Sequence, residues 1–573
     1  MYFNFKKKYL SLALVSLSIS SAYSLSTSDI YEHLKKVYPN YNGITYTKPS
    51  NNYLSNQWLI QTPGLWGKNM STYNAGFNPS AGYTMDKDFY IPTCKTSGDC
   101  NGYSVCSVPD YTADIKGNKK SLCTTSADTI LSSIYRTITS ANRSVDIVTL
   151  QPGHLIESIF TTEAFTSTIK NALISLAKKT IRTGNSIQVR FMQGGFLPIT
   201  SEINQDNANE ENKRLEQLKW SQNTYLSNIV NALPKDNHLN ISVGTMRSCQ
   251  NGIVPCGNDD MQKDPYLDFA WNHGKIIDVD GETLITGGHN LWGQDYLQKD
   301  PVNDLSIEIS GPIVVGATSY ANAIWNYTCK NQGTLSNLFY TYKNGKYSST
   351  CLPNISTKQK SNYHSYKSNI PVSAMSVAKL NNNVLKNDAD QSEISRVYAF
   401  NSARKSIKIT QQALFVKGVG DVISRPILHP LVTKDGTVME ALSNALSKGV
   451  SVYIVTSSLG GSGYSSNVDL KYIWDYLKTL LRVKHHMTND QANNVLSTSL
   501  HLGFISYDGK TINDKSHNKV WIVDDKVFYI GSHNIYASSL QQFGVIIDSD
   551  IAAKLLETKL WNPLWNYSQK YKN

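Results

Sequence analysis

The chain alternates between short runs of aliphatic residues and longer amphipathic segments, and this pattern predicts its fold class. Residues 144–149 and 186–191 have the composition of buried strands, and residues 171–177 between them have the apolar spacing of a helix. Strands that alternate with amphipathic helices are typical of βαβ units, which build a largely parallel sheet covered by helices. The pattern therefore predicts an α/β fold.

The same order of elements occurs again in the second half of the chain. The matching segments are strands at 406–410 and 450–455, a helix at 440–446, and a further pair of strands at 238–242 and 501–505. Glycine-bearing loops follow the second strand of each copy, at 193–195 and 459–463, but neither has a nucleotide-binding fingerprint. We expect ordinary loops there that at most help to shape a substrate site at the sheet edge.

The repeat and the flanking composition divide the chain into five parts. These are a signal peptide at 1–24, a cysteine-rich extension at 25–125, a first lobe at 126–352, a polar linker at 353–391 and a second lobe at 392–573. Three lysines precede a short apolar run that ends in small residues near Ser24, as in a secretory signal. We therefore expect a secreted protein, or one of a lysosomal or vesicular lumen, whose extension has irregular structure and no counterpart in the second copy.

All 8 cysteines lie before residue 352, and their even number favours disulfides. The spacings in the first cluster are too wide for zinc knuckles, and that cluster contains no histidine. Local pairs are expected for Cys249–Cys256 and Cys329–Cys351. The first cluster allows three connectivities among Cys94, Cys100, Cys106 and Cys123. Sequons for glycosylation are present, but a chain this rich in Asn, Ser and Thr produces them by chance.

Composition excludes several classes and adds one hint. With 573 residues, 40% hydrophobic and 10% aromatic, the chain is neither disordered nor a multi-span membrane protein. Charged residues make up only 17%, so much of the surface must be neutral and polar. Of the formal net charge of +11, three units belong to the predicted signal peptide, and the rest is scattered. An anionic partner is indicated, but no basic track for a nucleic acid is evident.

One pattern of five residues occurs in both halves with identical spacing, His-x-Lys-x4-Asp-x6-Gly-x2-Asn. The polar members are His273, Lys275, Asp280 and Asn290 in the first half, and His517, Lys519, Asp524 and Asn534 in the second. The alternation of His and Lys places both side chains on one face of a strand, about 7 Å apart. Two matches at corresponding places of a repeat leave little room for chance.

This paired motif resembles the one that defines the phospholipase D superfamily, and the resemblance runs from about residue 126 to the C-terminus. It implies two α/β/α lobes related by a pseudo-twofold axis, with both motifs meeting in one active site. Because both motifs lie in one chain, a monomer can complete that site. Gly288 stands where the family usually has serine, which Ser532 keeps, and this departure predicts the loss of one hydroxyl contact.

The residue types suit attack on a phosphodiester. Two lysines and the amides of Asn290 and Asn534 can hold the non-bridging oxygens and stabilise a pentacoordinate transition state. One imidazole can attack phosphorus while the other protonates the leaving alcohol. The lysines supply the positive charge, so no metal or cofactor is expected. Asp280 and Asp524 are expected to stabilise the motifs as hydrogen-bond acceptors.

The roles of the two histidines depend on what orients each ring. The resemblance implies an acid downstream of each motif, and Asp304 and Gln542 stand at the matching places. If each residue orients the histidine of its own half, the carboxylate favours His273 as the nucleophile and His517 as the general acid. Asp548 is an alternative partner for His517. We expect His289 and His533 to have a structural or rim role, and Trp325 and Trp561 to pack in the core.

Two enzyme functions and one binding function fit these residues. The first is a secreted phospholipase D that contacts a membrane surface transiently and releases the head group of a phosphatidylcholine-like lipid through a phosphohistidine. The second is a secreted or lysosomal nuclease that cleaves nucleic-acid diesters with the same chemistry. A non-enzymatic relic that binds lipid or nucleic acid is disfavoured, because both halves retain every charged motif residue. Scattered basic residues favour the lipid.

Overall fold

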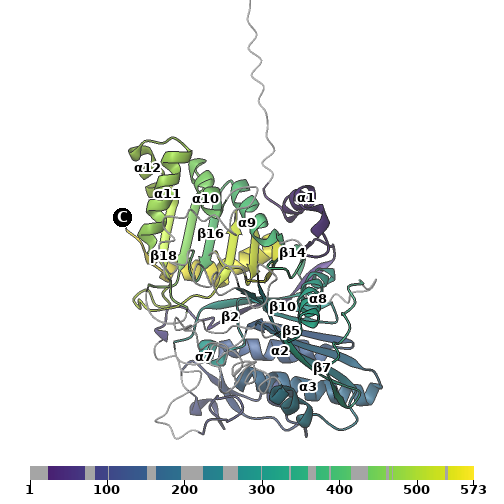
Figure 1. The fold of residues 1–573 in the computed structure, drawn as a ribbon. Coiled ribbons are helices and arrows are strands. Elements are labelled where there is room, and N and C mark those ends of the chain that lie inside the picture. Colours follow the sequence, from purple (N-terminus) through teal and green to yellow (C-terminus); the bar gives the residue numbers. More distant parts are fainter. Residues whose placement is uncertain are drawn as a thin grey trace, which may run out of the picture.

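The computed structural model shows two α/β lobes that meet along a shared core (Figure 1). It describes residues 24–70, 84–100, 102–150, 163–194, 223–249, 269–297, 300–333, 337–358, 370–385, 389–414, 437–459, 464–466, 469–535 and 540–572. The expected signal peptide lies almost entirely outside these residues. In the described residues, no helix is both long and apolar enough to span a bilayer.

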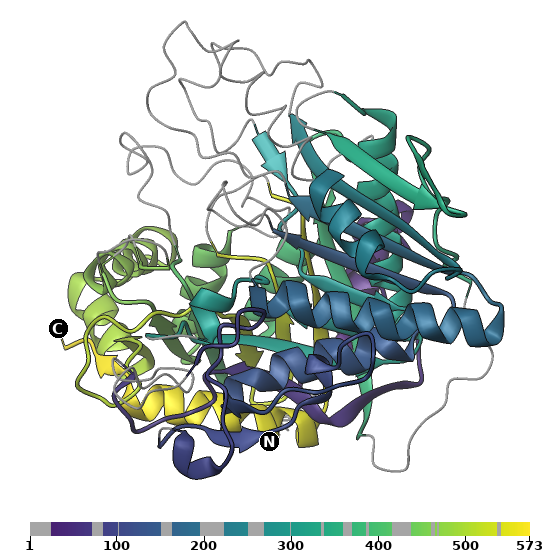
Figure 2. The ribbon, with the colours of Figure 1, turned by 90° about the horizontal axis from the view of Figure 1, so that it is seen from below.

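Nine strands in the order β13-β12-β7-β6-β5-β9-β10-β11-β2 form the sheet of the first lobe. Their bounds are β13 Lys346–Ser348, β12 Leu338–Lys343, β7 Leu239–Cys249, β6 Ile187–Gly194, β5 Ser144–Leu150, β9 Ile276–Val279, β10 Thr283–Gly287, β11 Asp304–Ser310 and β2 Asn52–Thr62. Two long helices, α2 (Thr129–Ser140) and α3 (Glu163–Thr183), lie side by side over this lobe, and Figure 2 shows them crossing it. A third helix, α8 (Val315–Lys330), contributes to a separate apolar cluster.

The sheet of the second lobe repeats this plan. Its strand order is β22-β18-β17-β16-β19-β20-β21-β14. The bounds are β22 Gln569–Lys570, β18 Leu500–Phe504, β17 Ser451–Thr456, β16 Ser406–Gln411, β19 Lys519–Val523, β20 Val527–Gly531, β21 Gln542–Asp548 and β14 Ile370–Leu380. Its helices are α9 Gln391–Ser402, α10 Val438–Ser447, α11 Leu470–Lys484, α12 Asn489–Ser499, α13 Asp550–Leu556 and α14 Asn562–Tyr567. The two-lobe α/β prediction is confirmed.

The sheets are mixed, so the expectation of largely parallel sheets was too simple. Among the described strands, only β5, β6 and β7 pair in parallel in the first lobe, and only β16, β17 and β18 do so in the second. The strands that carry the paired motif, β9–β10–β11 and β19–β20–β21, are antiparallel meanders. Short turns join β9 to β10 and β19 to β20, which is why the motif spacing is so compact.

The N-terminal extension and the linker are more regular than expected. In the extension, β2 pairs with β11. In the expected linker, β14 pairs with β21 in the same antiparallel way. These two strands therefore occupy equivalent places in the two sheets. The start of β14 also pairs with β2, which joins the two sheets. Helix α1 (Thr27–Val37) packs against α9, β14 and β21 of the second lobe.

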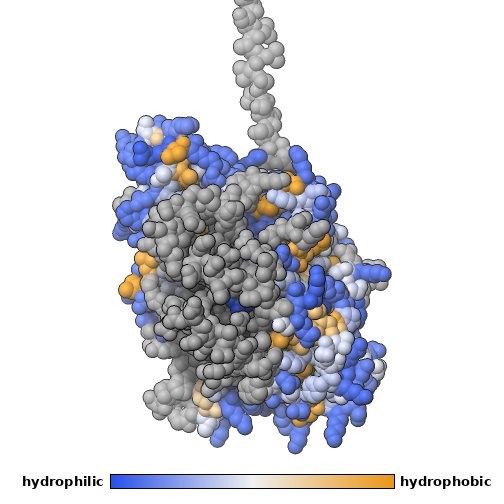
Figure 3. Space-filling view, in the orientation of Figure 1, coloured by the Kyte–Doolittle hydropathy of each residue, from blue (hydrophilic) through white to orange (hydrophobic). Residues whose placement is uncertain are grey.

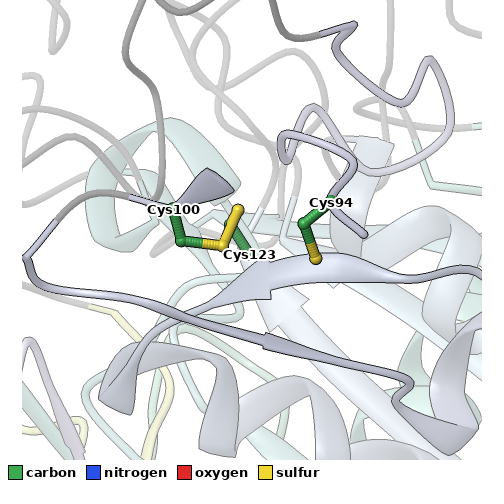
Figure 4. A group of neighbouring side chains, drawn as sticks. All are labelled: Cys94, Cys100 and Cys123. Carbon is green, nitrogen blue, oxygen red and sulfur yellow. A yellow bond between two sulfur atoms is a disulfide. The ribbon is translucent and has the colours of Figure 1, made fainter. Parts of the chain in front are cut away.

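Disulfides hold the segment inserted between β2 and α2. The bonds are Cys94–Cys106 and Cys100–Cys123, which selects one of the three connectivities left open by the sequence. Figure 4 shows Cys94, Cys100 and Cys123, whose sulfurs lie within 4.8 Å of one another. Because these sulfurs are bonded as disulfides, they offer no thiolates to a zinc ion. Cys329–Cys351 is also formed as expected, whereas Cys256 lies outside the described residues.

One apolar cluster joins the two lobes. Leu305 and Ile307 of β11, with Phe543 and Val545 of β21, are at most 1% exposed and belong to the same buried cluster. Trp325 and Trp561 are 2% and 3% exposed in that cluster, so the expected core packing of both rings is confirmed. The described surface in Figure 3 is mostly hydrophilic with isolated apolar residues, in line with its low charge content. This shared core fixes the first residues of β11 and β21 against the opposite lobe.

Candidate active site

The fold brings the two motif histidines together between the lobes. The ring centroids of His273 and His517 are 6.4 Å apart, and the ring planes are inclined by 82°. Each histidine precedes a motif strand and is anchored to the opposite lobe through its backbone. His273 donates its N–H to the carbonyl of Gln541 at 2.9 Å, and His517 donates to that of Asn303 at 2.7 Å. The site is thus made of both halves of one chain.

The partners that orient the rings are crossed between the lobes. Asp304 Oδ2 lies 2.8 Å from His517 Nδ1, and Gln542 Oε1 lies 2.9 Å from His273 Nδ1. Pairing within each half was therefore wrong, because β11 and β21 begin at the interface and aim their first side chains across it. Asp548, the alternative partner considered for His517, instead lies 3.5 Å from Lys526 Nζ.

The neighbours of Gln542 determine which nitrogen of His273 carries its hydrogen. Ser532 Oγ donates to Gln542 Oε1 at 2.8 Å, so this oxygen acts as an acceptor. Nδ1 of His273 must then be the donor to the same oxygen, which leaves Nε2 with a free lone pair. Burial, followed by the charges of Lys275 and Lys519, holds the pKa of His273 well below its usual value. The neutral ring is therefore available as a nucleophile.

The pair of His517 and Asp304 holds more protons. Burial raises the pKa of Asp304 to about 7, and burial together with the two lysines lowers that of His517. Below this pH the pair keeps two protons, one in the contact between Asp304 Oδ2 and His517 Nδ1. The other proton then lies on His517 Nε2, the position required of a general acid. Tyr296 supports the carboxylate by donating its hydroxyl to Asp304 Oδ2 at 3.0 Å.

Both motif lysines are buried beside the histidines. Lys275 Nζ donates to the backbone oxygen of His273 at 2.8 Å, and Lys519 Nζ donates to that of His517 at 2.6 Å. Each ammonium keeps two further hydrogens for a ligand. Burial lowers the pKa of Lys519 to about 7. Burial also lowers the pKa of Lys275, and repulsion by the charge of Lys519 lowers it further. Two such cations in one buried site favour an anion between them.

The motif asparagines complete this set, and Asn290 leads to a tyrosine that sequence reasoning missed. Asn290 and Asn534 are 1% and 0% exposed. Asn290 Nδ2 donates to the hydroxyl of Tyr464 at 3.0 Å, and that hydroxyl donates to Asp295 Oδ2 at 2.8 Å. The ring of Tyr464 lies 4.4 Å from that of His517. Its place directly after the glycine loop of the second lobe was the signal that could have found it.

The motif aspartates lie away from the reacting groups. Oxygens of Asp280 accept the backbone N–H groups of Asn142, Arg143 and Ser144 at 2.7–2.8 Å. Asp524 accepts the equivalent groups of residues 404–406 at 2.7–3.2 Å. Asp280 ties its motif hairpin to the turn between α2 and β5, and Asp524 ties its hairpin to the turn between α9 and β16. They stabilise the motifs, as expected, but do not belong among the residues that contact substrate.

An Asp280→Ala substitution should therefore lower stability and spare the chemistry. Loss of three hydrogen bonds to a buried carboxylate is expected to reduce the free energy of unfolding by about 3 kcal/mol. Urea unfolding followed by circular dichroism measures this change. The turnover number per folded molecule should stay within a few fold of wild type, and a much larger loss with unchanged stability would contradict this role.

Gly288 is a glycine because Asp304 occupies the space beside it. A Cβ at this position would lie 2.0 Å from Asp304 Oδ1 and 2.9 Å from the backbone oxygen of His517. Gly288 lacks the hydroxyl contacts that Ser532 makes to Gln542 and to the backbone of Phe543, as expected, and it leaves room for the carboxylate. At the equivalent place in the second lobe, Ser532 instead supports Gln542.

Gly288→Ala should displace the carboxylate from His517. Outer groups that orient a catalytic side chain typically contribute 10- to 100-fold to activity, so we expect a loss of about that size. Steady-state kinetics on a diester substrate measures it. Ser532→Ala, which adds no atoms beside a carboxylate, is the matched control and should lose less. Equal losses in the two variants would refute the steric explanation.

His289 has the structural role expected of it. Its Nδ1 lies 2.7 Å from Ser306 Oγ and its Nε2 lies 2.8 Å from Thr62 Oγ1, and the ring is 3% exposed. His533 is 1% exposed and lies about 4 Å from the carboxylates of Asp390 and Glu393. The buried rings of His289 and His533 therefore have a structural role next to Asn290 and Asn534.

The fold and this site define a duplicated α/β protein in which one His-x-Lys motif from each half faces an anion site. Residues 397–565 match the family model described as "Cardiolipin synthase, PLD-like domain". The chain is 31% identical over 348 residues to "Phospholipase D" of Streptomyces antibioticus. That match covers 53% of this chain and 60% of the relative, less than two thirds of its length.

Two solved structures are also similar to the chain. Phosphatidylserine synthase of Haemophilus influenzae is 12% identical, with a TM-score of 0.42, and the match covers 78% of this chain and 86% of that one. The phospholipase D family member Nuc of Salmonella typhimurium is 20% identical, with a TM-score of 0.20, and covers 31% of this chain and 90% of its own. The family match and the relative both point the same way as the motif. The chain is thus similar to members of the phospholipase D superfamily in its C-terminal half and in its paired motif.

Proposed function

We propose that this protein is a phospholipase D that hydrolyses the distal phosphodiester of a glycerophospholipid. The products are phosphatidic acid and the free head group. The observation that supports the proposal is the pair of histidines with different partners, Gln542 beside His273 and Asp304 beside His517. One ring is set as a nucleophile and the other as an acid, and two buried lysines flank them.

In the first step, His273 Nε2 attacks phosphorus and forms an N–P bond while the bond to the head-group oxygen breaks. His517 Nε2–H gives its proton to that oxygen, so the head group leaves as a neutral alcohol. Lys275, Lys519 and the two asparagine amides stabilise the charge on the non-bridging oxygens. The role proposed for His273 is the one predicted from the sequence, but the argument differs, because the carboxylate of Asp304 lies beside His517.

In the second step, His517 takes a proton from water as the water oxygen attacks phosphorus. The N–P bond breaks, and the electron pair returns to His273 Nε2. This regenerates both rings in their starting states. All charge stabilisation comes from side chains of this chain, and the proposal includes no metal ion or cofactor.

A lipid substrate is favoured over a nucleic acid because the 31% identical relative is named phospholipase D. We also propose that the protein is exported and acts as a monomer that contacts the membrane surface transiently. Three disulfides in the described residues are typical of an oxidising compartment, and both motifs lie in one chain. Mass spectrometry of the protein from its host medium would identify the mature N-terminus, which we expect near Leu25.

A transfer assay tests the reaction. Phosphatidylcholine vesicles with an added primary alcohol should yield a phosphatidylalcohol together with phosphatidic acid, because the alcohol intercepts the covalent intermediate. Chelator should leave the rate unchanged, and His273→Ala should abolish both products. A parallel sample with single-stranded DNA tests the nuclease alternative. Cleavage of DNA without any lipid product would overturn the choice of substrate.

A further inference from the structure

A buried charged cluster lies behind Asn534 in the second lobe. Arg396 of α9 is 1% exposed, and its Nη2 is 3.2 Å from Glu393 Oε2, one turn earlier on the helix. Lys379 Nζ lies 3.0 Å from Asp390 Oδ2 beside this pair. Burying these charges is costly unless they are paired and held by further hydrogen bonds. Such a cluster next to an active site calls for a specific use.

Arg396 contacts the part of the motif that carries the phosphate-binding amide. Its Nη1 donates to the backbone oxygen of Asn534 and its Nη2 to that of His533, both at 3.3 Å. A planar guanidinium that spans two consecutive carbonyls fixes the orientation of the peptide between them. That peptide leads directly into Asn534. The direction in which the Asn534 side chain points is therefore set from α9.

At the equivalent positions of the first lobe, which the structure describes, no charged pair is present. Helices α2 and α9 end at equivalent places, and the residues in the positions of Glu393 and Arg396 are Leu131 and Ile134. Ile134, with Lys275 and His289, lines a cavity of about 20 Å³. At the equivalent positions the second lobe has the buried charged side chains of Glu393 and Arg396. The two halves of the site are thus supported by different chemistry.

We propose that Arg396, held by Glu393, is a positioning residue for Asn534 in the proposed phosphodiester chemistry. Arg396 contacts neither substrate nor the histidine rings, and acts by fixing the backbone of residues 533–534. The second half of the site is therefore the more rigid phosphate anchor. This inference rests on the proposed function only in assigning a phosphate to the site.

The first lobe supplies the sequence for a test. Exchanging the pair for its counterparts, Glu393→Leu with Arg396→Ile, removes both charges together and leaves no unpaired ion in the core. The exchange should lower cleavage of bis(p-nitrophenyl) phosphate about tenfold or more, as should Asn534→Ala. Combined with Asn534→Ala, the exchange should have no further effect beyond about twofold, because both changes remove the same contribution. Losses that multiply would overturn the proposal.

A matched control separates positioning from stability. Asp146 and Arg190 form another buried pair, with both contacts at 2.6 Å, in the first lobe. Exchanging them for Leu and Met should lower the melting temperature without coupling to Asn534. If the contact with the carbonyls positions Asn534, Arg396→Lys should retain more activity than the exchange of Glu393 and Arg396 does.

Affinity for inorganic phosphate gives a readout that does not depend on turnover. In the wild-type background, the exchange should weaken phosphate binding measured by calorimetry. In the Asn534→Ala background, the same exchange should leave phosphate binding unchanged. If wild type binds phosphate with this coupling but cleaves no diester, the proposed function fails and the inference stands. If wild type cleaves diesters and the coupling is absent, the inference fails alone.

Discussion

His273→Ala should lower diester cleavage by roughly 10⁴-fold or more, because removal of a nucleophile abolishes the covalent route. The residual rate should show no burst and no transfer to alcohol. A substrate with a good leaving group, such as bis(p-nitrophenyl) phosphate, distinguishes this variant from its partner. Such a leaving group needs no proton, so His517→Ala should still form the phosphohistidine and then stall, because no base activates water.

Trapping and peptide mass spectrometry identify the labelled residue. With bis(p-nitrophenyl) phosphate, His517→Ala should carry a p-nitrophenyl phosphoryl group on His273, and His273→Ala should carry none. The matched control is His289→Gln, which changes a buried ring outside the reacting pair. The same phosphoryl group found on His517 in the His273→Ala protein would reverse the two roles, and the carboxylate of Asp304 would then support the nucleophile.

The residues of the site could be predicted from the sequence, but the hydrogen-bond partner of each histidine could not. The repeated spacing placed His273 and His517 in equivalent strands, and two equivalent strands meet when two lobes pack face to face. Which acceptor faces which ring depends on the side of the interface to which β11 and β21 lead. The spacing of residues within one half of the chain does not indicate on which side of the interface these strands begin. Asp304 was therefore found at the right site and assigned to the wrong histidine.

The place of β2 in the first sheet was hidden for a different reason. Strand β2 occupies the position of β14, but the disulfide-linked segment after it separates β2 from α2 in the sequence. The two strands share a place in the fold and no recognisable residues, since sheet positions accept any side chains that fit the burial. Tyr464 was missed because a single aromatic residue after a glycine loop has no pattern of its own.

Lys519→Met should reduce kcat/KM by about 10²- to 10³-fold, as expected for loss of one buried charge that stabilises the transition state. The pH dependence makes a sharper prediction. With burial lowering its pKa to about 7, Lys519 is charged below that pH and loses its charge as pH rises through it. In the free enzyme kcat/KM should therefore fall on the alkaline side of about 7. In the pH profile of kcat, the alkaline fall should occur at a higher pH, because a bound phosphodiester favours the charged form of Lys519.

Lys519→Arg separates the charge from its titration. A guanidinium stays protonated at every pH of the assay, so the alkaline limb assigned to Lys519 should move or vanish even where the altered geometry lowers the rate. The Lys275→Arg variant is the companion, because burial also lowers the pKa of Lys275. Rates for all three proteins, measured from pH 5 to 9 on one soluble diester, give the comparison. An unchanged alkaline limb in both arginine variants would assign it to Asp304 and His517, whose shared proton is lost over the same range.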